Sequence, residues 1–250
     1  MNPDWIVPDW PAPAQVRTLV TTRAGGVSVA PYAGLNLGDH VGDDRVSVAQ
    51  NRAILRTALP AEPVWLKQVH GIAVLDADSG IASTEADACV TRQAGRVCAV
   101  LTADCLPVLF CDHQGRVVAA AHAGWRGLAG GMLEATVAAM QVPAAGVMAW
   151  LGPAIGAQAF EVGDEVREAF VAVQPQASAA FVAHRRGKWL ADIYALARLR
   201  LQGIGVTRIY GGGACTYSEA ARFYSYRRDG ATGRMASLIW LHRDGTKAAS

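Results

Sequence analysis

Three short apolar segments in the middle of the chain limit what it can fold into. They cover residues 96–101, 106–111 and 116–121, and polar breaks separate them. Each is far shorter than the roughly 20 residues that a membrane-spanning helix needs, so they predict strands buried on both faces of a sheet. The chain can bury such strands, because hydrophobic residues make up 52% and charged residues 18% of its 250 residues. That composition excludes intrinsic disorder.

The rest of the chain mixes predicted strands and helices without a regular alternation. Strands are predicted over residues 15–22, 64–69, 72–76, 147–151 and 206–210, helices over 43–59, 127–140, 163–173 and 190–202, and a hairpin from 223–228 and 235–241. Asp43 or Asp44 can cap the first helix, and Pro60 ends it. The lack of a regular alternation predicts an α+β fold, and because no polar linker divides the chain, we predict one compact domain over residues 1–250. Prolines crowd residues 1–14, which predicts an irregular N-terminal arm.

Charge and cysteine usage narrow the range of partners and compartments. Subtracting 21 acidic from 23 basic residues leaves a net charge of +2, and no long basic run is present. We therefore expect a small-molecule ligand, with no nucleic acid and no membrane as partner. The five cysteines form no C-x-x-C pair, which argues against a disulfide framework or a structural zinc finger. The first residues lack the features of a secretory signal, so we expect a cytoplasmic protein with free thiols.

Polar residues interrupt the apolar segments at three places. These are K-Q-V-H-G (67–71), T-A-D-C-L-P (102–107) and H-A-G-W-R-G (122–127). Asp104 stands in an otherwise apolar run, where an unpaired carboxylate costs several kcal/mol, so the sequence predicts a use for it. Cys105 follows directly, which suggests a thiolate presented at a turn between strands.

His70 and His122 each end a predicted strand, and either alone is more often an ordinary core or turn residue. Together with Cys105 they make a ligand set for a first-row metal. Two neutral imidazoles and one thiolate leave a fourth position open on Zn²⁺, as in catalytic sites, and such an ion acidifies a bound water. The spacing alone is a weak signal, because the three residues lie far apart in the chain. Cys89, Cys98 and Cys111 are predicted to be core residues.

Six motifs, in order along the chain, resemble one family. They are T-T-R-A-G-G-V-S (21–28), N-L-G-D-H-V-G-D-D (36–44), K-Q-V-H-G, T-A-D-C-L-P-V, H-A-G-W-R-G and F-Y-S-Y-R-R-D-G-A-T-G-R (223–234). They resemble the laccase-domain "polyphenol oxidase" family, whose members are also named YfiH-like protein, peptidoglycan editing factor and purine nucleoside phosphorylase. The resemblance implies packed mixed β-sheets with outer helices, akin to a toxin deamidase fold. It also implies a zinc site at His70, Cys105 and His122, and it favours a monomer.

The activity that the resemblance implies is phosphorolysis of adenosine, inosine and methylthioadenosine, with some adenosine deamination. On this reading, Arg23 beside Gly25 and Gly26 binds phosphate, with Arg227 or Arg228 as further candidates. The predicted substrate-binding residues are Arg23, Gln68, Trp125 and Arg126, and the predicted catalytic residues are His70, Asp104, Cys105 and His122. Trp125 either stacks on the purine or packs beneath the loop, and Asp104 either contacts substrate or orients a metal ligand.

Other functions remain open on the same residues. A multicopper oxidase needs around ten histidines and this chain has six, but copper(II) at the same three ligands would support phenol oxidation. Cys105 with His122 or His70 as base would make a thiol hydrolase. From a different class, the protein would bind cell-wall precursors without turning them over. A metal-ligand set in an apolar cleft favours an enzyme over a passive binder.

Overall fold

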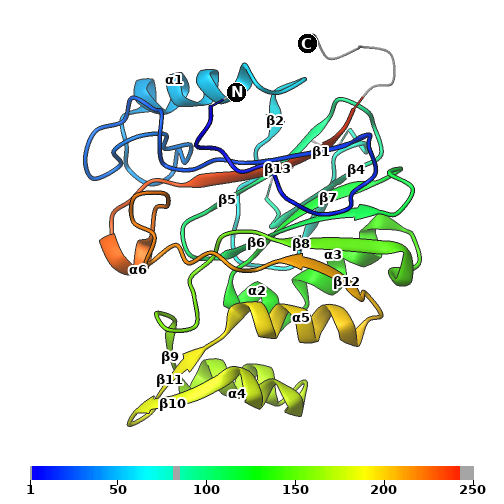
Figure 1. Cartoon of the computed structure of the whole chain (residues 1–250), viewed down its shortest axis with the longest axis vertical. Helices are drawn as coiled ribbons and strands as arrows, with labels where there is room; N and C mark the ends of the chain where they lie inside the picture. The colour runs from blue at the N-terminus through cyan, green and yellow to red at the C-terminus, as the bar shows by residue number, and fades with distance from the viewer. Residues whose placement is uncertain (1, 81–84, 243–250) are drawn as a thin grey trace.

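Two β-sheets pack face to face at the centre of the computed structural model, which describes residues 2–80 and 85–242 (Figure 1). The four-stranded sheet has the order β1 (Val16–Val20), β13 (Met235–Leu241), β5 (Val97–Thr102), β2 (Pro63–Val64). The six-stranded sheet has the order β12 (Arg208–Gly211), β8 (Val147–Leu151), β6 (Leu106–Asp112), β7 (Val118–Ala123), β4 (Ala88–Thr91), β3 (Val74–Asp76). Both are mixed, since β2–β5, β3–β4 and β8–β12 are parallel pairs and the other pairs are antiparallel.

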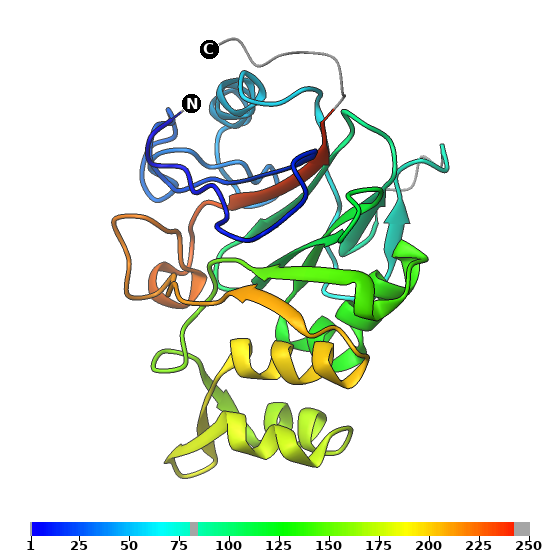
Figure 2. The ribbon, with the colours of Figure 1, turned by 45° about the vertical axis from the view of Figure 1, so that its right-hand side comes forward.

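Helices cover the outer faces of the two sheets (Figure 1). α1 (Arg45–Arg56) packs on the four-stranded sheet, and α2 (Trp125–Gly130), α3 (Met132–Met140) and α5 (Ile193–Gly203) pack on the six-stranded sheet. Beyond α5 lies a further layer made of α4 (Asp164–Val171) and a small sheet of β10 (Phe181–Arg185), β11 (Lys188–Ala191) and β9 (Glu161–Gly163), as Figure 2 shows. The remaining elements are α6 (Tyr226–Asp229) and the 3₁₀ helices η1 (Ala144–Gly146) and η2 (Pro175–Ala180).

Side chains alternate between two cores along each central strand. On β6, Leu109 and Cys111 lie between the two sheets, whereas Val108 and Phe110 face the helices. β5 alternates in the same way between the sheet interface and the face covered by α1. Both faces of these strands are buried, which explains why their sequences read as continuous apolar runs. The predicted α+β domain with mixed sheets and outer helices is confirmed.

Most of the predicted elements are present. Each of the three central segments is a strand, and α1 begins after Asp44, whose carboxylate accepts a hydrogen bond from the Ser47 amide (2.9 Å). Residues 2–14 contain no helix and no strand longer than an isolated bridge, and residue 1 of the predicted arm lies outside the described residues. Cys89, Cys98 and Cys111 are buried as predicted. Within the described ranges, every helix falls short of the length and hydropathy that a membrane crossing requires.

Four predicted elements are wrong in part. The helix expected over 127–140 is two helices, because Gly131 between them adopts a left-handed φ of 102°. The predicted hairpin does not form: α6 takes the place of its first strand, and β13 pairs instead with β1 and β5. The strand expected over 64–69 is limited to Pro63–Val64, and the start of the helix expected over 190–202 belongs to β11. Strands β4, β9 and β10 were not expected.

Tyr194 on α5 joins the helical layer to the loops that end β8 and β12. Its hydroxyl accepts a hydrogen bond from the Ala154 amide (2.8 Å), donates to the Ala214 carbonyl (2.7 Å) and lies 3.1 Å from the Gly152 carbonyl. The side chain is buried, so these backbone groups have little water to replace the hydroxyl.

We predict that Tyr194→Phe lowers the free energy of unfolding by about 1–3 kcal/mol, because it leaves a buried amide and carbonyl without their partner. Urea denaturation measures the change. Tyr217→Phe is the matched control, since Tyr217 is 40% exposed and should change stability by less than about 0.5 kcal/mol. Equal effects of the two substitutions would contradict this role of the Tyr194 hydroxyl.

Candidate metal centre and its pocket

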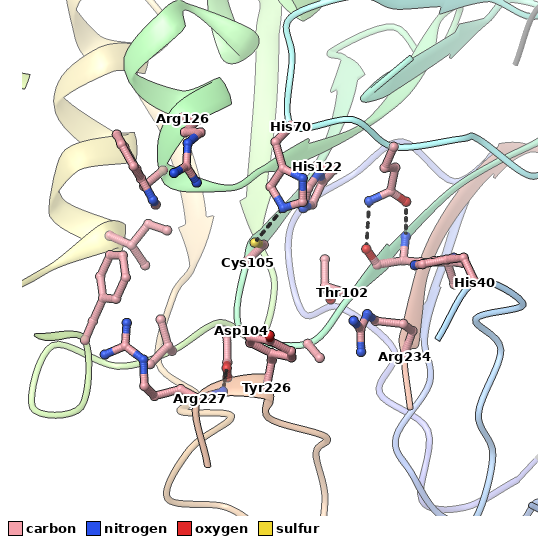
Figure 3. Close-up of a pocket in the computed structure, with 17 residues that line it drawn as sticks. His40, His70, Thr102, Asp104, Cys105, His122, Arg126, Tyr226, Arg227 and Arg234 are labelled. Atoms are coloured by element: carbon pink, nitrogen blue, oxygen red, sulfur yellow. Dashed lines mark hydrogen bonds between the residues drawn. The ribbon is translucent and has the colours of Figure 1, made fainter. Parts of the chain in front are cut away.

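A pocket of about 450 Å³ opens where β5 and β7 end and where β6 and β13 begin. The turn Ala103–Cys105 crosses there from β5 in the four-stranded sheet to β6 in the six-stranded sheet. His122 is on the neighbouring strand β7, opposite Pro107 of β6. The loop that carries His70 reaches the same edge of the sheet. The two sheets therefore bring together residues that are distant in the sequence (Figure 3).

The three predicted metal ligands meet in this pocket. One nitrogen of His70, one of His122 and the Cys105 sulfur all lie within 4.8 Å of one another. His70 Nε2 is 3.9 Å from Cys105 Sγ, and the two imidazole rings meet edge to face with centroids 4.8 Å apart. His122 is buried, Cys105 is half-buried and His70 is exposed, so the group is open to the pocket on one side. This group can hold a metal ion.

The space around the three side chains fits a small ion. Gly124 starts α2 behind them, and a Cβ added there would stand 2.9 Å from a His70 ring carbon and 3.0 Å from Cys105 Sγ. Any larger residue at this position would push the ligands apart. Two nitrogen donors and one sulfur donor match the chemistry of zinc, and copper(II) accepts the same donors. Among the residues that the structure describes, no other group of His, Cys, Asp and Glu is arranged in this way.

Asp87, which the sequence analysis did not select, fixes both histidines. Its Oδ1 is 2.8 Å from His122 Nδ1 and accepts the His70 amide (2.9 Å), and its Oδ2 accepts the amides of Gly71 (2.7 Å) and Val69 (3.2 Å). His70 has a left-handed φ of 62°, which these hydrogen bonds hold in place. The Nδ1 contact leaves Nε2 of His122 as the metal-facing nitrogen. Burial alone would raise the pKa of Asp87, but the contacts with His122 and the amides lower it.

The surroundings of Cys105 and His122 favour a thiolate at the first and a protonated imidazole at the second, a thiolate–imidazolium pair. Burial raises the pKa of the Cys105 thiol, but the neighbouring His122 and His70 outweigh it and lower the pKa from 9.0 to about 6. Burial lowers the pKa of His122, but Cys105 and Asp87 outweigh it and raise the pKa to about 9. The thiolate form that a metal requires is therefore already favoured near neutral pH.

Asp104 lines the pocket, but its carboxylate is occupied. Oδ1 accepts the Thr216 hydroxyl (2.6 Å) and Oδ2 accepts the Arg227 amide (2.7 Å). Its backbone is left-handed, with a φ of 88°. Within the described residues its carboxylate makes no hydrogen bond to His70, Cys105 or His122; it helps to hold the pocket wall, and its role toward substrate or metal stays a prediction.

Gln68, Trp125 and Arg126 also line the pocket. The side-chain amide of Gln68 is engaged on both sides by the backbone of Leu101, accepting from its N–H (2.7 Å) and donating to its C=O (2.8 Å). Trp125 is half-buried against the helical core, and the Arg126 guanidinium stacks on its ring at 4.4 Å. Their roles in substrate binding stay predictions.

Arg23 is not among the residues that line this pocket, so the structure places it apart from the metal-ligand group, and its role in binding phosphate stays a prediction. Its guanidinium stacks on the Tyr224 ring at 4.9 Å and donates to the Ala220 carbonyl (3.1 Å). The Arg228 guanidinium is also engaged: it pairs with the Asp229 carboxylate and donates hydrogen bonds to backbone carbonyls. Arg227 lines the pocket, and so does Arg234, which the sequence analysis did not select.

Comparison with known proteins shows the family of this chain. The family model described as multi-copper polyphenol oxidoreductase laccase matches residues 17–242. The chain belongs to this family. A purine nucleoside phosphorylase of Pseudomonas aeruginosa is 58% identical over 238 residues, 95% of this chain and 98% of the relative. The purine nucleoside phosphorylase YfiH of Escherichia coli is 58% identical over 239 residues, 94% of this chain and 98% of the relative.

Two solved structures share the fold of this chain. A Neisseria meningitidis protein superposes with a TM-score of 0.92 at 56% identity, covering 96% of this chain and all of that one. YlmD from Geobacillus stearothermophilus superposes with a TM-score of 0.89 at 34% identity, covering 96% of both chains. The resemblance seen in the sequence motifs is therefore confirmed.

We predict that Asp87→Asn lowers metal affinity by about 10- to 100-fold, because His122 loses the carboxylate that fixes its ring and tautomer. Competition with a chromophoric chelator measures the affinity. Asp112→Asn is the matched control: Asp112 is equally buried and accepts backbone amides, of Arg116 and Val117, but stands outside the pocket. If both variants bound metal like the wild type, Asp87 would not support the ligands.

We predict that Cys105 of the metal-free protein reacts with iodoacetamide with a midpoint near pH 6, because the thiolate is the reactive form and persists down to its pKa. Peptide mass spectrometry from about pH 5 to about pH 9 follows the modified residue. The urea-denatured protein is the reference, and its expected midpoint is about pH 8.5. A folded-state midpoint equal to that reference would rule out the thiolate–imidazolium pair.

Proposed function

We propose that this protein is a zinc-dependent purine nucleoside phosphorylase that acts on adenosine, inosine and methylthioadenosine. The observation that carries the proposal is the charge of the pocket. Arg126, Arg227 and Arg234 line it together with the metal-ligand group, and within residues 2–80 and 85–242 none of their guanidinium groups is paired with a carboxylate. A cavity with this excess of positive charge favours an anionic reactant, and phosphate is one. The names of the relatives point the same way.

The pocket also offers a place for the purine base. Ile155, Phe160 and Ile193 line it, and all three belong to the buried core beneath the helices. The flat ring face of a purine gains free energy by leaving water against such a wall, whereas the charged phosphate does not. The pocket volume of about 450 Å³ is within the range of small-molecule sites.

A zinc ion held by His70, Cys105 and His122, with one position open, would supply a Lewis acid on the pocket wall. The protein's own part is to fix the donors: Asp87 holds the His122 ring by its Nδ1, and the low pKa of Cys105 keeps a thiolate available. We propose adenosine deamination as a side activity of the same site, together with a link to the editing of peptidoglycan precursors, because the family resemblance implies both.

Two alternatives use the same residues. The description of the family model favours phenol oxidation with copper at the three ligands. The low pKa of the Cys105 thiol favours a hydrolase in which Cys105 is the nucleophile. A metal-independent hydrolase keeps its activity after chelation, and a copper enzyme regains activity with copper rather than zinc.

The deciding experiment incubates purified protein of measured metal content with adenosine, with and without phosphate. We expect ribose 1-phosphate and adenine only when phosphate is present, loss of turnover after chelation, and recovery with zinc. Inosine as the only product would instead assign a deaminase. No turnover of any nucleoside would overturn the proposal and favour the cell-wall alternative.

Cys105→Ser should lower the rate of phosphorolysis by at least about 100-fold. Replacing a residue that only hydrogen-bonds to a metal ligand already lowers metal affinity or activity by about 10- to 100-fold. Cys215→Ser is the matched control, because Cys215 is also a half-buried free thiol but does not line the pocket. Equal activity of both variants would remove the metal group from the reaction.

A further inference from the structure

Residues 36–38, which are far from Arg234 in the sequence, hold it just before the start of β13. Asn36 Oδ1 accepts the Arg234 amide (2.9 Å), and the Leu37 amide donates to the Arg234 carbonyl (3.2 Å). At Gly38, an added Cβ would stand 2.8 Å from Arg234 Cγ, so the lack of a side chain there makes room for the arginine stem. The motifs over residues 36–44 and 223–234 therefore converge on one side chain.

The Arg234 guanidinium is only partly satisfied. Nη1 donates to the carbonyls of Thr232 (2.9 Å) and Gly233 (3.0 Å). Nη2 and Nε make no hydrogen bond or ion pair with any residue in the described part of the chain. Burial lowers the pKa of Arg234, and the Cys105 thiolate and Asp104 are close enough to act against that shift. A desolvated cation with free donors is costly unless an anion completes it.

Thr102 and His40 line the pocket on the same side as Arg234. Thr102 ends β5 directly opposite Met235, and His40 stands on the loop that follows Gly38. In Figure 3, Arg234, Thr102 and His40 lie on one side of Cys105, and Arg126 and Arg227 lie on the other. We propose that Arg234, together with Thr102 and His40, binds inorganic phosphate and presents it as the nucleophile. This inference rests on the proposed function.

The other two arginines fit this role less well. The Arg126 guanidinium is exposed and stacked on Trp125, where water screens its charge. Arg227 is exposed to water, and its guanidinium lies over the Phe160 ring at 5.8 Å, beside the apolar wall. Arg234 alone of the three combines desolvation, free donors and a hydroxyl neighbour.

The geometry then orders the reactants along the pocket. Phosphate lies at Arg234, the purine lies against Ile155, Phe160 and Ile193, and the ribose spans the space beside Cys105. A phosphate oxygen forms a bond to C1′ of the ribose while the C1′–N9 bond breaks. The electron pair of that bond leaves with the purine, which takes up the proton of the hydrogen phosphate ion. Ribose 1-phosphate and free base result, with no further reactant needed.

The test measures phosphate binding directly and through kinetics. Isothermal titration of the zinc-loaded protein with inorganic phosphate should show roughly 10- to 100-fold weaker binding in Arg234→Gln, because charge-assisted hydrogen bonds are lost. The KM for phosphate should rise by the same factor, while the KM for adenosine changes less than about twofold. Arg234→Lys keeps the charge but not the paired donors, so its phosphate affinity should lie between those of the wild type and Arg234→Gln.

Arg45→Gln is the matched control, since Arg45 is exposed at the start of α1, outside the pocket, and its loss removes the same charge. Melting temperature and zinc content show whether each variant is folded, and Arg234→Lys carries the test if Arg234→Gln is not. Unchanged phosphate binding in a folded Arg234 variant, or the larger loss in Arg126→Gln, would overturn the assignment. If phosphate binding depends on Arg234 but no nucleoside is cleaved, the proposed function fails and the subsite stands.

Discussion

The candidate centre depends on one buried carboxylate. Asp87 precedes β4 and contacts the ring of His122 on β7 and the backbone of the loop that carries His70, so a single group sets two ligands relative to each other. The Asp87 carbonyl also accepts the His122 amide (2.7 Å), which fixes the β4–β7 register at this point. A slip of one residue would turn Asp87 to the other face of the sheet and separate the histidines. The relative placement of the two histidines in the candidate metal centre is therefore a consequence of strand pairing.

The turn between β5 and β6 places the third ligand. It carries the chain from one sheet to the other, and Asp104 at its centre adopts a left-handed backbone. Its carboxylate accepts from Thr216 and from the Arg227 amide, and its carbonyl accepts from the Ile155 amide (2.9 Å). One residue thus joins three loops around the pocket. Because the Asp104 carboxylate accepts from these neutral donors, it forms no ion pair with the arginine side chains that the structure describes around the pocket.

Much of this arrangement could be predicted from local sequence. His70, Cys105 and His122 interrupt or end apolar runs, and a polar residue in such a place signals a use. Asp87 carries the same signal, but the short strand that follows it was not expected. The sequence around Arg234 does not mark it as a site residue, because most arginines lie on the protein surface. Only the fold shows which arginine lies in a pocket without a carboxylate partner. Arg23 had the favourable glycine neighbours, yet its guanidinium stacks on Tyr224, a partner 201 positions away in the printed sequence.

The two ends of the pocket are built by different layers of the fold. Arg234 and Thr102 belong to the four-stranded sheet, where β13 begins and β5 ends. Ile193 begins α5 and Phe160 leads into the small sheet, so the apolar wall belongs to the helical layer. The ligand group stands at the junction, with Cys105 on the turn that connects the sheets. On the proposed function, changes in the helical layer would therefore alter which base is accepted while the anion end and the metal-ligand group stay in place. Such a separation would let one fold vary its substrates around a fixed reacting group.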